Sequence, residues 1–358
     1  MTSHRSSNPS LHRAFLIKAA IAATTLLGSC GQQAANLTSE EAALLREVLA
    51  LVEIAPTRAE FDGERLVERF EGDASTLVSA HTERVQTDGE GGFSIEPLEV
   101  IHSGAVLGDQ FLVIEDSRAG WNWRYRDFRI HDVDAVLENY TVLDFGELTE
   151  VAGRPCYHLE VAKVVDPFTV KHAVDVDLES GLVLRHEVLQ NSTLVRYRSE
   201  YTSIAYDTGA PFAPHGEHAQ FESFDSLEGL SEELGFEVKA PRVTLDGFSE
   251  ESFGRLSELS GEAWGMIEYT DGIEALFFLT RRKGMESLGE VAQSVTASDG
   301  GAAYRQGGAP GTDTSSDLMV GLTAGALSIL QADLGDRRQL VVGRVPMDEL
   351  RWWLESSL

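Results

Sequence analysis

Val151-Ala-Gly-Arg-Pro-Cys-Tyr-His-Leu-Glu-Val161 and Asp175-Val-Asp-Leu-Glu-Ser-Gly-Leu-Val-Leu-Arg185 are the two pieces of sequence that decide the fold. In the first piece Tyr157, Leu159 and Val161 alternate with polar residues or cysteine, a period of two that is typical of a strand with one buried face. Residues 170–178 repeat this alternation, with His172 among valines, and Glu179-Ser-Gly181 supplies the small residues of a tight hairpin. Two further strand patterns lie at 182–189 and 194–206. The stretch therefore predicts a meander of antiparallel strands.

These two pieces, in this order and spacing, resemble the N-terminal domain of the RseB/MucB regulators of the sigma-E envelope-stress response. That domain is in turn similar to the lipoprotein carriers LolA and LolB. The hairpin Tyr269-Thr-Asp-Gly272 and the ending Gly343-Arg-Val-Pro346 resemble the smaller C-terminal domain of the same family. The fold class implied is α+β and mainly β. It is a LolA-like unclosed antiparallel β-barrel with covering helices and an apolar cleft, plus a smaller α+β C-terminal domain.

The first 29 residues have the pattern of a cleaved export signal. Arg5 and Arg13 precede an apolar run at 14–27 that is too short to cross a bilayer. The run ends in Leu27-Gly-Ser-Cys30, which resembles the bacterial lipobox and predicts that Cys30 is the lipidated first residue of the mature chain. The alternative is an ordinary secretory signal with an incidental cysteine. Gly31 is not the aspartate that retains lipoproteins in the inner membrane of enterobacteria, so we expect an anchor facing the periplasm, in the outer rather than the inner membrane.

The charge of the chain restricts its partners. The formal net charge is −29, and removal of residues 1–29 takes away Arg5, Arg13 and Lys18 but no acid, which brings it to −32. Nothing would then neutralise phosphates, so nucleic acid is excluded as a partner. Direct adhesion to an anionic lipid surface is disfavoured. A cationic partner, divalent counter-ions or a saline habitat all fit this charge.

Patterns along the rest of the chain predict two domains. Residues 30–37 form a tether, 38–207 the LolA-like domain, 208–225 a linker rich in Gly, Pro and His, and 226–358 the C-terminal domain. In the first domain Thr38-x-x-Glu41 is a capping box for a helix over 40–54, and a second helix covers 132–140. Strand patterns of the first domain lie at 61–70, 76–85, 93–102, 111–115 and 141–145.

The C-terminal domain has a clear hairpin over 263–280, with Asp271-Gly272 at its turn. The other elements expected there are a helix at 227–234, a loop at 297–317, strands at 326–332 and 339–345, and a closing helix at 346–354.

Candidate catalytic and metal-binding residues are few. His215-Gly-Glu-His218 places two histidines three residues apart on a linker, which is weak evidence for a zinc site because known sites have more ligands. We expect neither a metal nor another cofactor. Cys156 is alone once Cys30 is lipidated, has no catalytic signature around it, and is expected to be buried. The chain contains no nucleophile elbow, zinc-protease helix, Walker loop or dinucleotide fingerprint. We therefore expect a binding protein and not an enzyme.

Two binding functions remain open. The resemblance implies a regulator that holds the periplasmic domain of an anti-sigma factor, or another envelope protein, shields it from the first protease, and releases it when lipids bind. The alternative is a LolA/LolB-like carrier or acceptor of lipoproteins or lipid. The lipobox favours the carrier, since LolB-type factors are lipoproteins, whereas the C-terminal domain favours the regulator, since the carriers end after the first domain. Both imply a cleft for an acyl chain. Its candidate wall is Trp121, Trp123, Tyr125 and Phe128, which would otherwise be the buried face of a strand.

Overall fold

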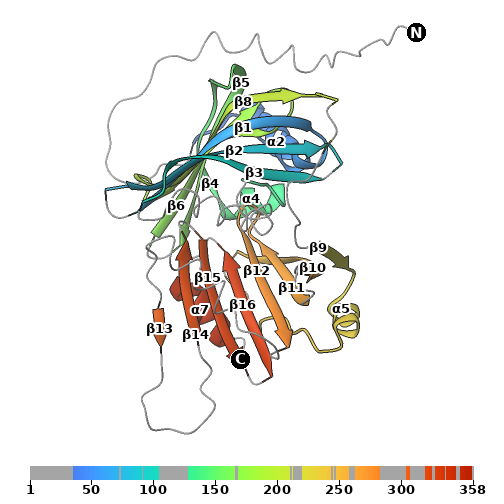
Figure 1. The fold of residues 1–358 in the computed structure, drawn as a ribbon. Helices are drawn as coiled ribbons and strands as arrows, with labels where there is room; N and C mark the ends of the chain where they lie inside the picture. The colour runs from blue at the N-terminus through green and yellow to red at the C-terminus, as the bar shows by residue number, and fades with distance from the viewer. Residues whose placement is uncertain are drawn as a thin grey trace, which may run out of the picture. The chain divides into compact units, whose positions relative to one another are not determined.

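The computed structural model describes residues 35–71, 74–90, 92–104, 128–165, 168–209, 212, 220–242, 245, 247–257, 263–282, 304–306, 319–324, 327–334, 336–343 and 347–356. Ala34–Leu358 form one compact unit. Within it, the described strands make two eight-stranded antiparallel sheets (Figure 1). No helix among the described residues has the length and apolar character needed to span a membrane.

The first sheet confirms the predicted meander. Its strand order is β3-β2-β1-β8-β7-β6-β5-β4, so β5 to β8 are consecutive neighbours and β3 and β4 are the two edges. Among the described strands the sheet is therefore open, as the fold class predicts. The strands are β1 (Glu60–Glu71), β2 (Thr76–Asp88), β3 (Phe93–His102), β4 (Thr141–Val151), β5 (Arg154–Val165), β6 (Phe168–Asp177), β7 (Val183–Gln190) and β8 (Leu194–Tyr206).

Among the described residues, two helices pack on the first sheet, and each begins at a side-chain N-cap. Helix α2 (Ser39–Ile54) has the complete capping box of Thr38 and Glu41, and the short 3-10 helix η1 (Ala55–Thr57) follows it. Helix α4 (Val133–Asn139) is capped by the Asp132 side chain. The buried residues of both helices share one core with strands β4 to β6: Leu45, Val48, Leu49, Val52, Val136, Phe145, Tyr157, Leu159, Val161, Val174 and Val176.

The second sheet has the order β13-β14-β15-β16-β12-β11-β10-β9. Its strands are β9 (Gln220–Phe224), β10 (Ser249–Ser257), β11 (Ala263–Thr270), β12 (Ala275–Arg282), β13 (Tyr304–Gln306), β14 (Met319–Ala324), β15 (Leu327–Leu334) and β16 (Arg337–Gly343). Helices α5 (Leu227–Leu234) and α7 (Met347–Ser356) contribute Leu230, Leu350, Trp353 and Leu354 to its core. The Trp353 ring meets Tyr269 and Phe278 edge-on, with centroids 5.2 and 5.6 Å apart.

The structure differs from the sequence prediction at several elements of this second part. Strands β10 and β14 were not expected, β9 lies inside the range expected as a linker, and β13 lies inside the range expected as a loop. The β11–β12 connection is four residues long, because Thr270 pairs with Ala275. Asp271 and Gly272 lie in this connection, as predicted, and Ile273 and Glu274 complete it. The Asp271 carboxylate accepts hydrogen bonds from the N–H groups of Ile273 and Glu274, which holds the wider loop.

Candidate functional site at the junction of the two sheets

The tip of the β11–β12 hairpin, residues 271–274, is built into the core of the first sheet. Ile273 is 4% exposed and belongs to the same apolar cluster as the core strands β5 and β6. The carbonyl of Gly272 accepts a hydrogen bond of 2.9 Å from the N–H of His131, just before α4. A Cβ at Gly272, where φ is +104°, would lie 2.6 Å from the backbone nitrogen of Val136. Only glycine therefore allows this close approach of the hairpin to α4.

Asp271 forms a buried polar centre at this tip. The residue is 1% exposed, and its carboxylate accepts hydrogen bonds from the Tyr140 hydroxyl at 2.9 and 3.0 Å and from the Lys163 ammonium at 2.8 Å. Asn139 donates to the Asp271 carbonyl and to the Gly247 carbonyl. Burial, with the nearby Asp271 charge as a second cause, raises the pKa of Tyr140 well above its usual value. The hydroxyl therefore stays protonated and donates a hydrogen bond to the Asp271 carboxylate.

Glu274 begins a second polar contact that runs into the first sheet. Its Oε1 lies 3.2 Å from Nε2 of His172 on β6, and Nδ1 of His172 lies 3.2 Å from Nε2 of His186 on β7. The two imidazoles are stacked, with centroids 5.5 Å apart, and both are fully buried. The Phe128 ring meets both imidazoles edge-on, at 5.1 Å from His186 and 5.7 Å from His172. A chain of buried polar contacts thus joins the hairpin tip to β6 and β7.

The same face of the first sheet carries a buried ion pair farther along. Arg65 on β1 and Glu83 on β2 are direct cross-strand partners, with Nε to Oε1 at 2.7 Å. His81 lies 3.1 Å from the other oxygen of Glu83, and the guanidinium lies over the Tyr201 ring at 5.6 Å. All three polar side chains are buried. Cross-strand partners share a face of the sheet. Ser199 pairs with His186 on one side and with Val67 on the other, and Val67 lies two residues after Arg65 on β1, so the ion pair and His186 are on the same face.

This polar band lies on the face for which the sequence predicts an apolar cleft. Phe128 is the described member of the predicted wall, and it is buried in the core beside the two histidines. A cavity of about 50 Å³ is lined by residues that include Phe61, Arg65, Phe128, His186 and Tyr201. That volume holds about one or two waters. Trp121, Trp123, Tyr125, Cys30, His215 and His218 lie outside the described residues, so the acyl cleft, the lipid anchor and the linker histidines stay predictions.

Cys156 is buried, as the sequence predicts. Burial, helped by the nearby charges of Asp177 and Asp175, raises the pKa of the thiol to about 12. The sulfur is therefore protonated at neutral pH and is a poor nucleophile. His158, two residues farther along β5, is held by the Asp175 carboxylate at 2.8 Å, and this hydrogen bond raises the pKa of the imidazole.

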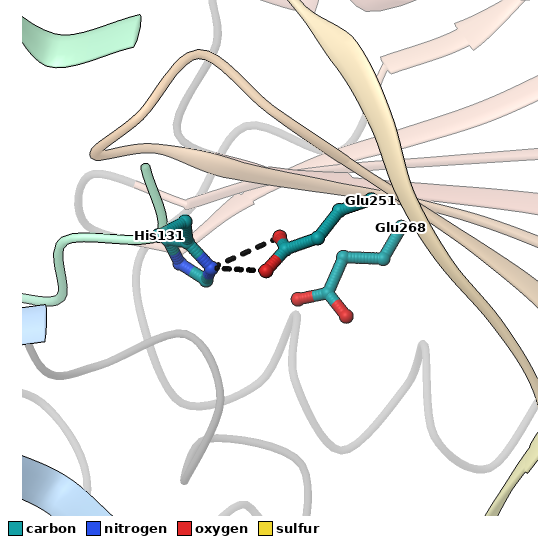
Figure 2. A group of neighbouring side chains, drawn as sticks. All are labelled: His131, Glu251 and Glu268. Carbon is teal, nitrogen blue, oxygen red and sulfur yellow. Dashed lines mark hydrogen bonds and ion pairs between the residues drawn. The ribbon is translucent and has the colours of Figure 1, made fainter. Parts of the chain in front are cut away.

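A third group of ionisable side chains joins the two sheets beside the hairpin. His131, Glu251 on β10 and Glu268 on β11 point toward one another, and one nitrogen or oxygen atom of each lies within 4.8 Å of the others (Figure 2). Nδ1 of His131 is 3.0 Å from both carboxylate oxygens of Glu251. Among the described residues, these three have the donor atoms and the spacing needed to hold a metal ion.

Most of this junction was not predicted from the sequence. Asp271 was predicted only as a turn residue, and His172 only as a residue of a strand. A usable signal was present, because His172 takes an inward position among Val170, Val174 and Val176. A buried polar group in such a position needs a hydrogen-bond partner from another element.

Comparison with known proteins gave structural matches alone. No family model matches the chain, and no curated protein matches it in sequence. A crystal structure of MucB is similar over 88% of this chain and 97% of that chain, with 16% identity and a TM-score of 0.45. The complex structure of Pseudomonas aeruginosa MucA/MucB covers 86% and 96%, with 15% identity and a TM-score of 0.41. MucB in complex with MucA(peri) covers the same shares, with 14% identity and a TM-score of 0.40.

Proposed function

We propose that this chain is a non-catalytic binding protein of the bacterial cell envelope, of the RseB/MucB regulator type. Its partner would be the extracytoplasmic segment of an anti-sigma factor or another envelope protein, as MucA is for MucB in the complexes described above. The observation that carries the proposal is the insertion of the second domain's hairpin tip into the core of the first sheet. A regulator of this type uses two domains, and here the core of the first sheet includes Ile273 from the hairpin of the second sheet.

The junction also favours the regulator over a carrier. A LolA/LolB-like carrier consists of the first domain and uses the interior of its sheet for an acyl chain. In this chain Ile273 fills part of that interior, and Glu274 and Asp271 bring charge to it. Burying a charge costs free energy unless it is paired, so an interior of this kind is better suited to fixing the second domain than to holding a mobile lipid.

We expect the partner to present a positively charged surface to this acidic chain. With a net charge of −32 after removal of the signal, the chain attracts basic segments and repels acidic ones. Electrostatic attraction of this kind mainly raises the association rate and weakens as salt screens it.

Titration of the full chain, purified in mild detergent, tests the proposal directly. We expect saturable binding of the anti-sigma factor segment from the same organism, with an association rate that falls by about tenfold or more between low and physiological salt. A segment of the same length with its basic residues changed to glutamine is the control and should bind more slowly. Absence of binding to the anti-sigma segment and to other extracytoplasmic segments from the same organism would contradict the proposal.

The carrier alternative has its own readout. A carrier would bind a fatty acid or a lipopeptide saturably, with a change in Trp fluorescence that weakens in Trp123→Ala. It would also take a lipoprotein from a donor membrane. Lipid binding together with anti-sigma binding fits the regulator, whereas lipoprotein transfer without anti-sigma binding identifies the carrier.

The membrane anchor is a separate prediction. If Cys30 is acylated, Cys30→Ala should abolish incorporation of labelled palmitate and release the chain from the membrane fraction, because acyl chains contribute about 0.8 kcal/mol for each buried CH₂. Cys156→Ala is the matched control and should leave labelling unchanged, since that thiol is buried. A Cys30→Ala variant that still takes up label and still sediments with membranes would show that the lipobox assignment is wrong.

A further inference from the structure

The residues His131, Glu251 and Glu268 come from three separate segments that the fold brings to one place. His131 directly precedes α4, where its N–H is held by the Gly272 carbonyl and the next residue, Asp132, caps the helix. Glu268 lies on β11 and is 6% exposed, and Glu251 lies on the neighbouring strand β10. Figure 2 shows both carboxylates turned toward the imidazole.

An irregularity in β10 explains how the side chains of two adjacent residues, Glu251 and Ser252, both reach Glu268. The pairing of β10 with β11 shifts between Glu250 and Ser252, so Glu251 is the extra residue of a β-bulge. In a regular strand the side chains of Glu251 and Ser252 would point to opposite faces. Here Ser252 donates a hydrogen bond of 2.8 Å to Glu268, and Glu251 also reaches the same group. Bulges commonly redirect a side chain in this way.

We propose that His131, Glu251 and Glu268 bind a divalent transition-metal ion of the Zn²⁺ type. Imidazole nitrogen and carboxylate oxygen are both ligands of zinc, and three protein ligands leave the fourth tetrahedral position for water. The imidazole selects against Ca²⁺ and Mg²⁺, which prefer ligand sets made of oxygen alone. Bonds of about 2.0–2.2 Å need the donor atoms closer together than 4.8 Å, and small rotations of the glutamate side chains provide this.

The surroundings fit an ion that enters from solvent. The Glu251 side chain is 33% exposed, whereas the His131 side chain is 8% exposed, so the site has an open side and a buried side. Ser252 orients Glu268 in the way that outer hydrogen-bond partners orient metal ligands. The two carboxylates add negative charge to a chain that is already strongly acidic, and a divalent cation neutralises it.

Metal binding here would tie the start of α4 to strands β10 and β11, and so would stabilise the junction of the two sheets. It does not depend on the partner proposed above. An ion that binds the folded state alone raises the unfolding temperature in proportion to the logarithm of its concentration above Kd. The site would therefore make the stability of the junction depend on the supply of zinc in the envelope.

The test uses the full chain in mild detergent, titrated with Zn²⁺ in the presence of excess Mg²⁺ to suppress diffuse binding to surface acids. We expect one ion per chain at this site, a rise of several degrees in the unfolding temperature, and, with Co²⁺ as a substitute, absorption bands of a four-coordinate site. Glu268→Gln and His131→Gln should each lower the affinity by at least about tenfold and abolish the thermal shift. Circular dichroism confirms that each variant is folded.

Two further variants show whether the ion binds elsewhere. His102→Gln changes an exposed histidine at the end of β3 and should leave the affinity unchanged. The double variant H215A/H218A removes the two linker histidines and should also leave it unchanged. Loss of binding in that double variant with retention in Glu268→Gln would overturn the proposal, as would binding that Mg²⁺ removes entirely.

Discussion

Asp271→Ala is expected to lower the free energy of unfolding by about 3–5 kcal/mol, the cost of removing one partner of a buried ion pair. The carboxylate is buried, and the Lys163 ammonium that faces it is 14% exposed, so water replaces the lost contact only in part. The same change removes an acceptor of the Tyr140 hydroxyl and of two N–H groups in the hairpin tip. Urea titration followed by Trp fluorescence and far-UV circular dichroism measures the effect.

Two variants separate the causes. Asp271→Asn keeps an oxygen that can accept from the tip N–H groups but removes the charge, so its loss of stability should be smaller than that of alanine. Asp134→Ala removes an exposed ion pair with Arg46, in which the side chains are 58% and 82% exposed, and should cost less than about 1 kcal/mol. If Asp271→Ala and Asp134→Ala lower the free energy of unfolding equally, the buried contacts of Asp271 stabilise the protein no more than an exposed ion pair does, and the prediction is wrong.

Local patterns were enough to predict much of the first sheet. Strands β5 to β8 have regular alternation and glycine or short polar connections, and they pair with their neighbours in sequence, so no long-range information is needed. Helices α2 and α4 have side-chain caps that are visible in the sequence. These elements form where the pattern places them because local preference and core burial agree.

Sequence reasoning failed where pairing is distant or where a residue serves a contact with another element. Strand β9 pairs with β10 across α5, and Gly254 leaves β10 without a clear apolar alternation. The contacts of the junction join residues more than a hundred positions apart in sequence. Asp271 contacts Tyr140, and Glu274 contacts His172. A hairpin turn and a strand histidine look the same in sequence whether they face solvent or a second sheet.

The last prediction concerns the buried pair Arg65–Glu83, in the interior where we expected only apolar side chains. Glu83→Ala should lower the free energy of unfolding by about 3–5 kcal/mol, because it leaves the Arg65 charge in the interior without its cross-strand carboxylate. Replacing both residues together, as Arg65→Met with Glu83→Leu, should recover most of this loss, since a buried ion pair is often no more stable than an apolar pair of similar volume. Chemical denaturation of the single and double variants measures their free energies of unfolding and so ranks them by stability.

A matched control lies on the same two strands, three residues from Arg65 on β1 and one residue from Glu83 on β2. Asp62 on β1 and Arg84 on β2 form a pair with Nε to Oδ1 at 2.8 Å, and their side chains are 20% and 41% exposed. Hydrogen bonds from Arg84 lower the pKa of the Asp62 carboxyl, so the stability from this pair is present at neutral pH and is lost as the pH falls through the acid range. Asp62→Ala should cost about 1 kcal/mol or less at neutral pH. If Glu83→Ala costs no more than Asp62→Ala, or if the double variant is as unstable as Glu83→Ala, the pair is not a buried charge held by its partner. The interior would then be open to water or to a ligand, as the acyl cleft requires.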